Sequence, residues 1–500
     1  MNFIPDEGKK TGNYFCTWDS QCDEVYFRDT SSCDFSGRDA MCEEFLFGKN
    51  GLLNSFDGIR GDIIVVLDDG WDVPFGAKDS RLFGLLIPDD ERFPSLKGLS
   101  PAKKLRALSD KIRAMGYRGL GLWIPSQVPT IVNGKEVSYT PEEERNYWEE
   151  RAKWCGEAGV MYLKTDWGKH SNDPEYRAMM TDCMRRYAPD LLIEHAFFGH
   201  PLFESEKDGH EMPEIVKDFL RKVIPVSDFL RTNDVCHEVK YASTVDRAAI
   251  CLEEAQNSEG KCAVLNGEDT ALISAALGCA IGIMRHEFEN KRKYVPLPPR
   301  SIAETECAVR WQRIAPPVPA NIGKLHISSE RLKDVWHCPD RARNLWPSLP
   351  EGDYYVTAPA AVSRNMPLPQ VKAEGEKPYV LCSVHPDSGA LCVSVTPRTF
   401  FDKIDVTPLA SICVKGGSVS APLGIFGRFE SLSVDFDGKT EGMDVYAQNM
   451  LSSEAQKITD RVSLCGNRLT VSGELMEEIG KIDGGNAIPA VVIRLIGKNS

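Results

Sequence analysis

The chain has few of the features that mark nucleic-acid-binding or membrane-spanning proteins. Its 59 lysines and arginines are outnumbered by 73 aspartates and glutamates, which gives a formal net charge of −14. Phosphate recognition needs clustered Lys and Arg, so this balance opposes binding to nucleic acid or to anionic membranes and favours a neutral ligand. No apolar stretch reaches the ~20 residues that a membrane helix requires.

Cysteines are present but show no pattern. The 16 cysteines include no CxxC pair and no regular framework, and several, such as Cys279 and Cys382, sit inside apolar segments where a thiol behaves as a small hydrophobe. The first residues have neither the basic nor the apolar region of a signal peptide. These features predict a cytoplasmic protein, with disulfides between some of the cysteines left open.

Motifs for bound cofactors are also missing. The sequence has no phosphate-cradling GxxxxGK or GxGxxG, no GxSxG nucleophile elbow, and no His/Cys/Asp set with metal-ligand spacing. We therefore expect no cofactor and no metal. The composition, 42% hydrophobic and 26% charged, is that of an ordinary globular protein, and 500 residues favour two domains.

Strand-like runs alternate with amphipathic helical patterns over residues 1–325. Several of the helical stretches open with Pro next to Ser, Thr or Asp, which is a helix-start signal. The predicted strands cover residues 14–17, 63–67, 119–123, 161–164, 191–195, 229–231, 263–266 and 281–285. Eight strands alternating with helices predict a parallel (β/α)₈ barrel.

The pattern changes after the barrel. Residues 326–345 are expected to form a linker, and residues 346–500 contain short alternating runs separated by Gly, Asp, Asn and Pro. This texture predicts an antiparallel β-sandwich domain that packs against the barrel.

Acidic and aromatic side chains follow two of the predicted strands. Asp68, Asp69 and Trp71 end the second strand, and Lys164 and Asp166 end the fourth. Carboxyl ends of barrel strands converge at one edge, where catalytic residues gather. Carboxylates beside tryptophans suit a sugar pocket, because the ring covers the apolar face of a pyranose and the carboxylates bind hydroxyls or do acid/base and nucleophilic work.

Four motifs in order carry a family resemblance. FCTWD at 15–19, LDDGW at 67–71, LKTDW at 163–167 and LRTND at 230–234 resemble the motif series of the α-galactosidase clan, meaning glycoside hydrolase families 27 and 36 and the raffinose-synthase-like proteins. The resemblance covers about residues 12–290. It implies a retaining exo-hydrolase that acts on terminal α-galactose-like residues by double displacement.

The resemblance also implies roles for individual residues. Asp166 matches the clan's nucleophile and Asp234 its acid/base. Lys164 lies two residues before Asp166 on the same strand and so on the same face, where its ammonium favours the ionised carboxylate and donates to a sugar hydroxyl. Arg231 resembles the arginine that reaches toward the sugar and the acid/base.

Asp68 and Asp69 match the paired acids that bind hydroxyls on the far side of the pyranose. Adjacent strand residues face opposite sides, so both reach a ligand only if the strand has ended and the backbone turns, which Gly70 permits. Trp18 and Trp123 are similar to the walls of the clan's pocket.

The fifth strand departs from the clan's pattern. It ends in EHAFFGH at 194–200, where Glu194 is a loose match to the residue that reads the sugar's C2 substituent, and His195 is either a pocket residue or a satisfied strand-end histidine. The specificity of an α-N-acetylgalactosaminidase or of a β-L-arabinopyranosidase therefore stays open. Glu268, after the seventh strand, either lines the outer pocket or caps a helix.

Two other functions stay open. One is a raffinose-synthase-like transglycosylase, which needs an aromatic acceptor platform that the sequence does not locate. The other is a non-catalytic carbohydrate-binding barrel, which the presence of both Asp166 and Asp234 argues against. The expected partner is a small oligosaccharide or glycoside, with a homo-oligomer possible.

Overall fold

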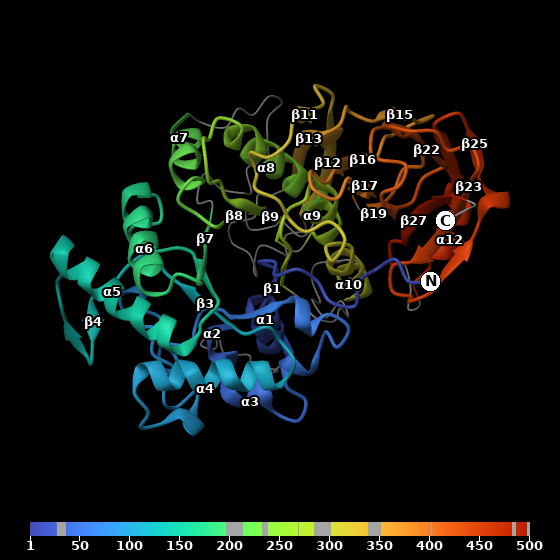
Figure 1. Ribbon diagram of the computed structural model, residues 1–500. Helices are drawn as coiled ribbons and strands as arrows, with labels where there is room; N and C mark the ends of the chain where they lie inside the picture. Colours follow the sequence, from blue (N-terminus) through green and yellow to red (C-terminus); the bar gives the residue numbers. More distant parts are fainter. Residues whose placement is uncertain are drawn as a thin grey trace.

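The computed structural model describes residues 1–27, 37–196, 214–232, 239–268, 270–284, 302–338, 352–401, 403–482 and 487–497. Figure 1 shows an α/β barrel on one side and a group of β-sheets on the other, with both chain ends on the side of the sheets. The first residues are tied there by hydrogen bonds from Phe3 N to Gln448 Oε1 (2.7 Å) and from Ala455 N to Met1 O (2.9 Å).

Eight parallel strands form the barrel, in the spatial order β10-β1-β2-β3-β6-β7-β8-β9. Their bounds are β1 (Tyr14–Cys16), β2 (Ile64–Leu67), β3 (Leu120–Ile124), β6 (Tyr162–Thr165), β7 (Leu192–Ala196), β8 (Phe229–Arg231), β9 (Val264–Asn266) and β10 (Gly282–Ile283). A parallel bridge between Asn266 and Ala280, with Ala280 N donating to Leu265 O at 2.7 Å, joins β9 to the chain entering β10 and closes the ring. The predicted (β/α)₈ barrel is confirmed, strand by strand.

Helices cover the outside of the barrel. They are α1 (Trp18–Phe27), α2 (Gly37–Ala40), α3 (Glu43–Phe47), α4 (Pro101–Ala114), α5 (Pro141–Ala158), α6 (Pro174–Tyr187), α7 (Glu214–Val223), α8 (Lys240–Ala255), α9 (Ala271–Leu277) and α10 (Ile302–Trp311). The helix-start signals are confirmed, because α4, α5 and α6 each begin with Pro. Thr140 and Glu143 form a capping box at α5, and Asp173 caps α6.

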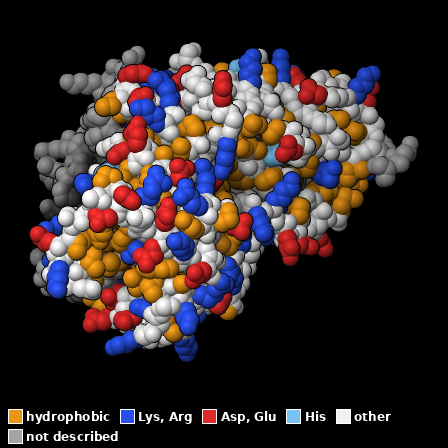
Figure 2. Space-filling model, turned by 60° about the vertical axis from the view of Figure 1, so that its left-hand side comes forward, with side chains coloured by type: hydrophobic (Ala, Val, Ile, Leu, Met, Phe, Trp, Pro, Cys, Tyr) orange, Lys and Arg blue, Asp and Glu red, His pale blue; other side chains and the backbone are white. Residues whose placement is uncertain are grey.

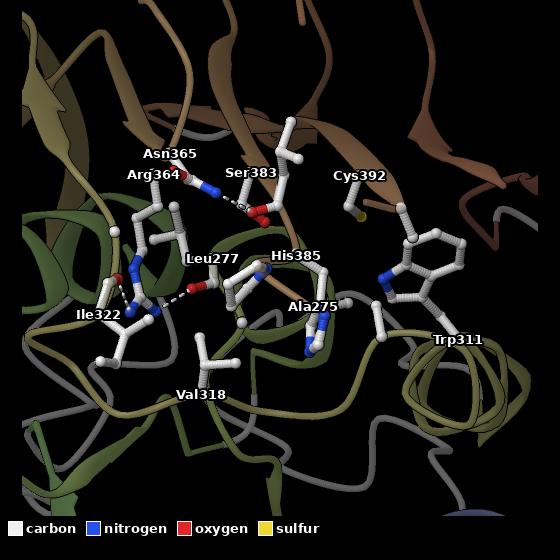
Figure 3. Close-up of a pocket in the computed structure, with 16 residues that line it drawn as sticks. Ala275, Leu277, Trp311, Val318, Ile322, Arg364, Asn365, Ser383, His385 and Cys392 are labelled. Atoms are coloured by element: carbon white, nitrogen blue, oxygen red, sulfur yellow. Dashed lines mark hydrogen bonds between the residues drawn. The ribbon is translucent and has the colours of Figure 1, made fainter. Parts of the chain in front are cut away.

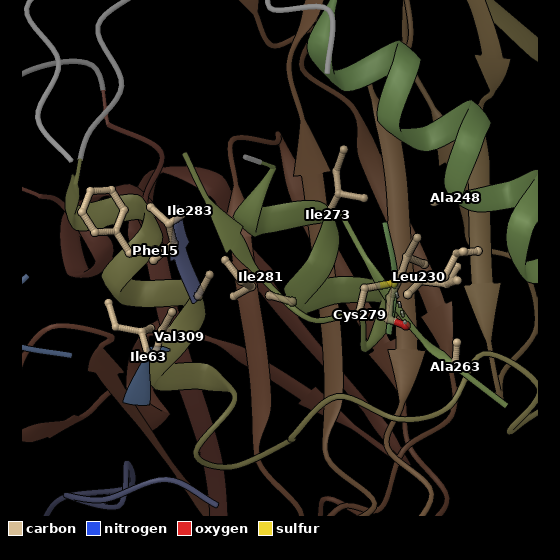
Figure 4. Close-up of a cluster of buried hydrophobic side chains, with 14 of the residues drawn as sticks. Phe15, Ile63, Leu230, Ala248, Ala263, Ile273, Cys279, Ile281, Ile283 and Val309 are labelled. Atoms are coloured by element: carbon tan, nitrogen blue, oxygen red, sulfur yellow. Dashed lines mark hydrogen bonds between the residues drawn. The ribbon is translucent and has the colours of Figure 1, made fainter. Parts of the chain in front are cut away.

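Side chains alternate between the two faces of each barrel strand. Outward-facing residues such as Phe15, Leu230 and Ile283 pack against the surrounding helices (Figure 4). Inward-facing residues, among them Tyr14, Tyr162 and Phe229, belong to a separate buried cluster that fills the barrel interior. Two residues further along, the inward positions hold Lys164 after Tyr162, Arg231 after Phe229 and Asp68 after Val66, and these polar residues build the site.

The C-terminal residues form a β-sandwich and a smaller sheet. Their bounds are β11 (Leu325–Ile327), β12 (Arg331–Cys338), β13 (Gly352–Pro359), β14 (Ala361–Arg364), β15 (Gln370–Lys372), β16 (Tyr379–Val384), β17 (Leu391–Thr396), β18 (Arg398–Phe400), β19 (Lys403–Val406), β20 (Ser411–Lys415), β21 (Leu423–Gly427), β22 (Ser431–Asp435), β23 (Met443–Asn449), β24 (Ala455–Lys457), β25 (Ser463–Cys465), β26 (Arg468–Ser472), α12 (Gly473–Gly480) and β27 (Ala490–Gly497). The orders are β11-β14-β16-β17-β21-β27-β23-β24, β15-β20-β22-β26-β25 and β13-β12-β18-β19.

The sheets are mixed rather than purely antiparallel. The pairs β14–β16, β17–β21 and β20–β22 run parallel, because the chain crosses to another sheet between these strands instead of returning by a hairpin. Strands β11 and β12 lie in the range predicted as a linker, and β11 pairs with β14. The domain boundaries themselves stay a prediction.

A buried arginine joins the barrel to the sandwich. Arg364 of β14 donates to the carbonyl oxygens of Leu277 (2.6 Å), Pro319 (2.7 Å) and Ile322 (3.0 Å), beside a cavity of about 20 Å³ (Figure 3). Burial lowers the pKa of this guanidinium. Nearby, Trp311 of α10 fits over Gly424, where an added Cβ would lie 2.8 Å from the indole.

The described surface carries charges of both signs. Figure 2 shows lysines and arginines interspersed with aspartates and glutamates over the described part of one face. Among the described helices, none is long and apolar enough to cross a bilayer. Within the same residues, thirteen cysteines are free thiols, most of them buried.

Candidate active site

Polar side chains from five barrel strands meet at the carboxyl-terminal end of the barrel. Inward-facing residues at the ends of β2, β3, β6, β8 and β9 form a connected set: Asp68, Trp123, Lys164, Asp166, Arg231 and Glu268. The sequence predicted this convergence for all of them except Glu268, which was expected in an outer pocket or at a helix cap.

Asp166 has a donor on each carboxylate oxygen. Arg231 Nη2 donates to Oδ1 at 2.8 Å, and Trp123 Nε1 donates to Oδ2 at 2.9 Å. Burial acts to raise the pKa of Asp166, but the charges of Arg231 and Lys164 and the indole hydrogen bond outweigh it and hold the pKa below its ordinary value. The side chain keeps 14% of its surface exposed, so this ionised carboxylate is accessible.

Lys164 is buried between carboxylates. Its Nζ lies 3.0 Å from Asp68 Oδ2, 3.2 Å from Glu268 Oε1 and 3.3 Å from Cys16 Sγ. Burial acts to lower the pKa of Lys164, but the neighbouring acids, Asp68 first, raise it well above its ordinary value, so the amine is an ammonium. Its charge favours ionised Asp166 as predicted, while its hydrogen bonds go to the other acids.

Glu268 connects the two buried cations. Its Oε1 accepts from Tyr14 Oη at 2.9 Å and lies beside Lys164, and its Oε2 accepts from Arg231 Nη1 at 3.3 Å. The side chain is 3% exposed. Glu268 lies two residues after Asn266, and side chains two residues apart point to the same face of a strand. This spacing was the feature of the sequence that could have placed Glu268 on the inner face of the barrel.

Asp68 and Asp69 separate as the backbone turns. Gly70 has φ +113°, and an added Cβ there would lie 2.6 Å from Arg38 O, so the predicted turn after β2 is present and requires glycine. Asp68 Oδ2 accepts from Cys16 Sγ at 2.8 Å and from Lys164, whereas Asp69 Oδ2 accepts from Arg38 Nε at 2.8 Å. Burial raises the pKa of Asp69 to about 7, with Arg38 opposing.

Aromatic rings line one side of the set. The Trp123 ring centre lies 5.3 Å from that of Trp167, and Phe83 meets Trp167 edge-on at 5.4 Å. Trp18, at the start of α1, is partly buried against the interior cluster that contains Trp123. The two predicted wall residues therefore lie near the site, together with Trp167, to which the sequence analysis gave no role of its own.

Of the two readings left open for His195, the structure shows the satisfied strand-end histidine and not the pocket residue. Its Nδ1 lies 3.1 Å from Arg177 Nη1 and its Nε2 2.9 Å from Thr181 Oγ1, both on α6, and the residue is 0% exposed. Burial, with the charges of Arg177 and Arg185, lowers its pKa well below the ordinary value. The reason is strand alternation, since Glu194 takes the inward position and its neighbour must face the helix layer.

Glu194 faces the barrel axis but lies beneath the mouth. It is 0% exposed and accepts hydrogen bonds from Tyr14 Oη (3.2 Å), Tyr162 Oη (2.9 Å) and Asn266 Nδ2 (2.6 Å). Burial raises its pKa to about 7, against the charge of Arg231. With both oxygens bonded inside the barrel, this carboxyl is not placed to read a sugar substituent.

Asp234, the predicted acid/base, lies outside the described residues, as do Asp269 and residues 197–200. Within the described ranges, no group of three or more His, Cys, Asp or Glu side chains is arranged to hold a metal ion.

Comparisons with known proteins give distant similarities only. No protein-family model matches the chain. No curated protein matches it either. Among solved structures, a proposed α-galactosidase from Bacteroides fragilis covers 98% of this chain and 79% of its own at 11% identity, with a TM-score of 0.41. A proposed α-N-acetylgalactosaminidase from Bacillus halodurans covers 99% of both chains at 10% identity, with a TM-score of 0.42.

A third solved structure also matches over nearly the whole length of this chain. A family-27 β-L-arabinopyranosidase from Geobacillus stearothermophilus covers 99% of this chain and 97% of its own at 10% identity, with a TM-score of 0.38. At such identities and scores, the similarity by itself assigns no activity to the chain.

Proposed function

We propose that the protein is a retaining exo-glycoside hydrolase acting on terminal α-galactose-like residues. The observation that carries this proposal is Asp166, an accessible carboxylate at the barrel mouth with a lowered pKa and a hydrogen-bond donor on each oxygen. A nucleophile must be ionised at the working pH, and the surroundings of Asp166 favour that state.

The proposed mechanism is a double displacement at the anomeric carbon. An Asp166 oxygen attacks the anomeric carbon and forms a C–O bond, while the glycosidic C–O bond breaks and the leaving oxygen takes a proton from Asp234. Water then attacks the anomeric carbon of the covalent glycosyl-enzyme and gives its proton to Asp234, which frees Asp166. Two inversions give net retention. The role of Asp234 rests on its motif.

The rest of the site fits a hydroxyl-rich ligand. Lys164 donates to Asp68 beneath the mouth, and the buried Trp123 donates to Asp166, so polar groups of both kinds lie next to the proposed nucleophile. Because Glu194 is bonded within the barrel, the C2 substituent must be read by other groups. The activity test therefore includes glycosides of galactose, of N-acetylgalactosamine and of arabinopyranose.

The test is the release of p-nitrophenol from α-galactoside, α-N-acetylgalactosaminide, β-L-arabinopyranoside and α-glucoside. We expect hydrolysis of one of the first three, reduced at least about 10³-fold in Asp166→Asn, because the amide cannot act as the nucleophile. Asp435→Asn is the matched control, since this carboxylate pairs with Arg468 on the surface of the sandwich.

Two further measurements test the double-displacement mechanism independently of the rate of hydrolysis. A 2-deoxy-2-fluoro glycoside should label the peptide that contains Asp166, as read by mass spectrometry, and NMR of the first product should show the retained anomer. An inverted product, or full activity in Asp166→Ala, would refute the mechanism. A folded protein that binds the sugars but cleaves none would favour the binding barrel.

A further inference from the structure

A buried carboxyl group lies level with Lys164 inside the barrel, and the proposed mechanism does not use it. Glu194 of β7 is 0% exposed and stands opposite Lys164 in the pairing of β6 with β7. Its hydrogen-bond partners are two tyrosines and an asparagine, and among the described residues it forms no ion pair with a lysine, arginine or histidine. A buried carboxylate without a paired cation is costly, and such a group stays neutral by keeping its proton.

The hydroxyl of Tyr14 lies between two carboxyl groups. Tyr14 Oη is 2.9 Å from Glu268 Oε1 and 3.2 Å from Glu194 Oε1, and a phenol has a single proton to donate. Glu268 lies 3.2 Å from Lys164 and 3.3 Å from Arg231, so it is the ionised acid of the two and accepts the shorter hydrogen bond. The donor in the longer contact is therefore Glu194 rather than Tyr14.

The other oxygen of Glu194 is an acceptor. Tyr162 Oη at 2.9 Å and Asn266 Nδ2 at 2.6 Å both donate to Oε2. A protonated carboxyl group has one hydroxyl and one carbonyl oxygen, so a hydroxyl at Oε1 and a carbonyl at Oε2 match all three contacts. The pKa of about 7, which burial raises, agrees with a group that is protonated below neutral pH.

The proton on Glu194 affects how the two buried cations are shared. Lys164 and Arg231 already face three described carboxylates at the barrel mouth, and an ionised Glu194 would add a fourth. Of the cations, Arg231 acts most strongly on Glu194, and it is also the cation that lowers the pKa of Asp166 most. A charge on Glu194 would draw Arg231 away from Asp166. The titratable and charged groups that face Glu194 come from four strands: Tyr14, Tyr162, Lys164, Arg231 and Glu268.

We propose that Glu194 is a positioning residue that holds a proton inside the barrel, donates it in a hydrogen bond to Tyr14 and so keeps Arg231 on Asp166. Hydroxide removes this proton at higher pH, which leaves a carboxylate and a water molecule. Activity then falls on the alkaline side because of a group that never touches the substrate. The effect on activity rests on the proposed function, whereas the protonation of Glu194 does not.

Infrared spectroscopy tests for the proton directly. A protonated carboxylic acid has a carbonyl band that carboxylates lack, so the spectrum of the parent at about pH 6 minus that of Glu194→Gln should show one such band. Tyr14→Phe removes the acceptor and should shift this band in the otherwise unchanged acid. The control is Asp435→Asn, which should remove no acid band because Arg468 lowers the pKa of that carboxylate. No band in the difference spectrum, or a band that Tyr14→Phe leaves in place, overturns the inference.

The kinetic test uses the glycoside that the parent cleaves. The ratio of kcat/KM at pH 8.5 to kcat/KM at pH 6.5 is measured in the parent and in Glu194→Gln, whose amide stays neutral and can donate to Tyr14 at both pH values. The protonated fraction of a group with a pKa of about 7 falls more than about tenfold over this range, so the ratio should be about tenfold higher in Glu194→Gln. The titration of Asp234 is common to both proteins. Equal ratios overturn the inference.

The pH dependence of unfolding keeps this inference separate from the proposed function. The pKa of Glu194 is raised from an ordinary 4.5 to about 7, so its proton contributes stability that is complete below the ordinary value and is lost as the pH rises through the folded value. The unfolding free energy of the parent relative to Glu194→Gln should therefore fall from about pH 4.5 to about pH 7 and then level off. If the parent cleaves no glycoside, the proposed function fails, while this dependence and the infrared band still decide on the proton. A constant difference over this range refutes it.

Discussion

Arg231 should set the acid limb of the activity profile through its contact with Asp166. Replacing Arg231 by Met removes the cation whose Nη2 lies 2.8 Å from Asp166 Oδ1 while keeping most of the buried aliphatic volume. Burial, Lys164 and the Trp123 indole still act on the carboxylate, so the change isolates the largest effect that lowers its pKa.

The size of the effect can be bounded. Two unit charges about 4 Å apart interact by ~4 kcal/mol at an effective dielectric of 20, which corresponds to an upper limit of ~3 pKa units. Aspartates next to arginines show shifts of ~1–3 units. Since Asp166 is 14% exposed and keeps two other favourable partners, we expect its pKa to rise by ~1–2 units in Arg231→Met.

The sign follows from the state that reacts. Asp166 acts when ionised, so activity is present above its pKa and is lost as the pH falls through it. A raised pKa moves the acid limb of kcat/KM to higher pH in Arg231→Met. Arg231→Lys keeps a cation and should shift the limb less, and Arg461→Met, on the surface of the sandwich, should not shift it.

A second measurement does not depend on turnover. A carboxylate whose folded pKa lies below its unfolded value contributes stability above the unfolded pKa, and this contribution disappears as the pH falls through the folded pKa. The unfolding free-energy difference between the parent and Asp166→Asn should therefore fall on acidification. In the Arg231→Met background this dependence should shrink or reverse. If Arg231→Met changes neither the acid limb of kcat/KM nor the pH dependence of the unfolding free-energy difference, the electrostatic role of Arg231 is refuted.

Three further substitutions test other parts of the structure. Glu268→Gln removes the negative charge between Lys164 and Arg231 and should lower the unfolding free energy by about 3 kcal/mol, as measured by chemical denaturation. This value is at the low end for a broken buried ion pair, because Lys164 keeps Asp68 and Arg231 keeps Asp166 as partners. Gly168→Ala strains the backbone at a positive φ against the neighbouring loop at Ser126 and should lower the unfolding free energy by ~1–3 kcal/mol, as measured by chemical denaturation. Arg364→Met leaves three buried carbonyls without their donor, and we expect at least ~3 kcal/mol of destabilisation, read as a lowered Tm.

The barrel could be predicted because each strand carries a local signal. Short β-prone runs alternating with amphipathic helices, three of which begin with Pro, predicted all eight strands, including the two-residue β10, which is held by its neighbours rather than by its own length. The parallel pairing of some sandwich strands could not be predicted in this way. A parallel pair such as β17–β21 joins segments that are separated in the chain by several other strands.

For the site, strand alternation explains where the predicted side chains lie. The alternation argument was applied to Lys164 and Asp166, and the structure places both at the mouth. For the neighbours Glu194 and His195 it was not applied, although two adjacent strand residues cannot both face the pocket. The partners of Glu268 come from three strands far apart in the chain, so its position needed the closed barrel.

The buried charges at the barrel mouth also bear on the stability of the barrel. Lys164, Arg231, Asp68 and Glu268 are each at most 4% exposed, and such ion sets often add less stability than apolar side chains of the same volume would. A barrel kept only as a scaffold would gain by drifting toward leucines and methionines at these positions. A variant in which all four are replaced together by apolar side chains is therefore expected to be inactive yet more stable, a trade-off between activity and stability located at four strand ends.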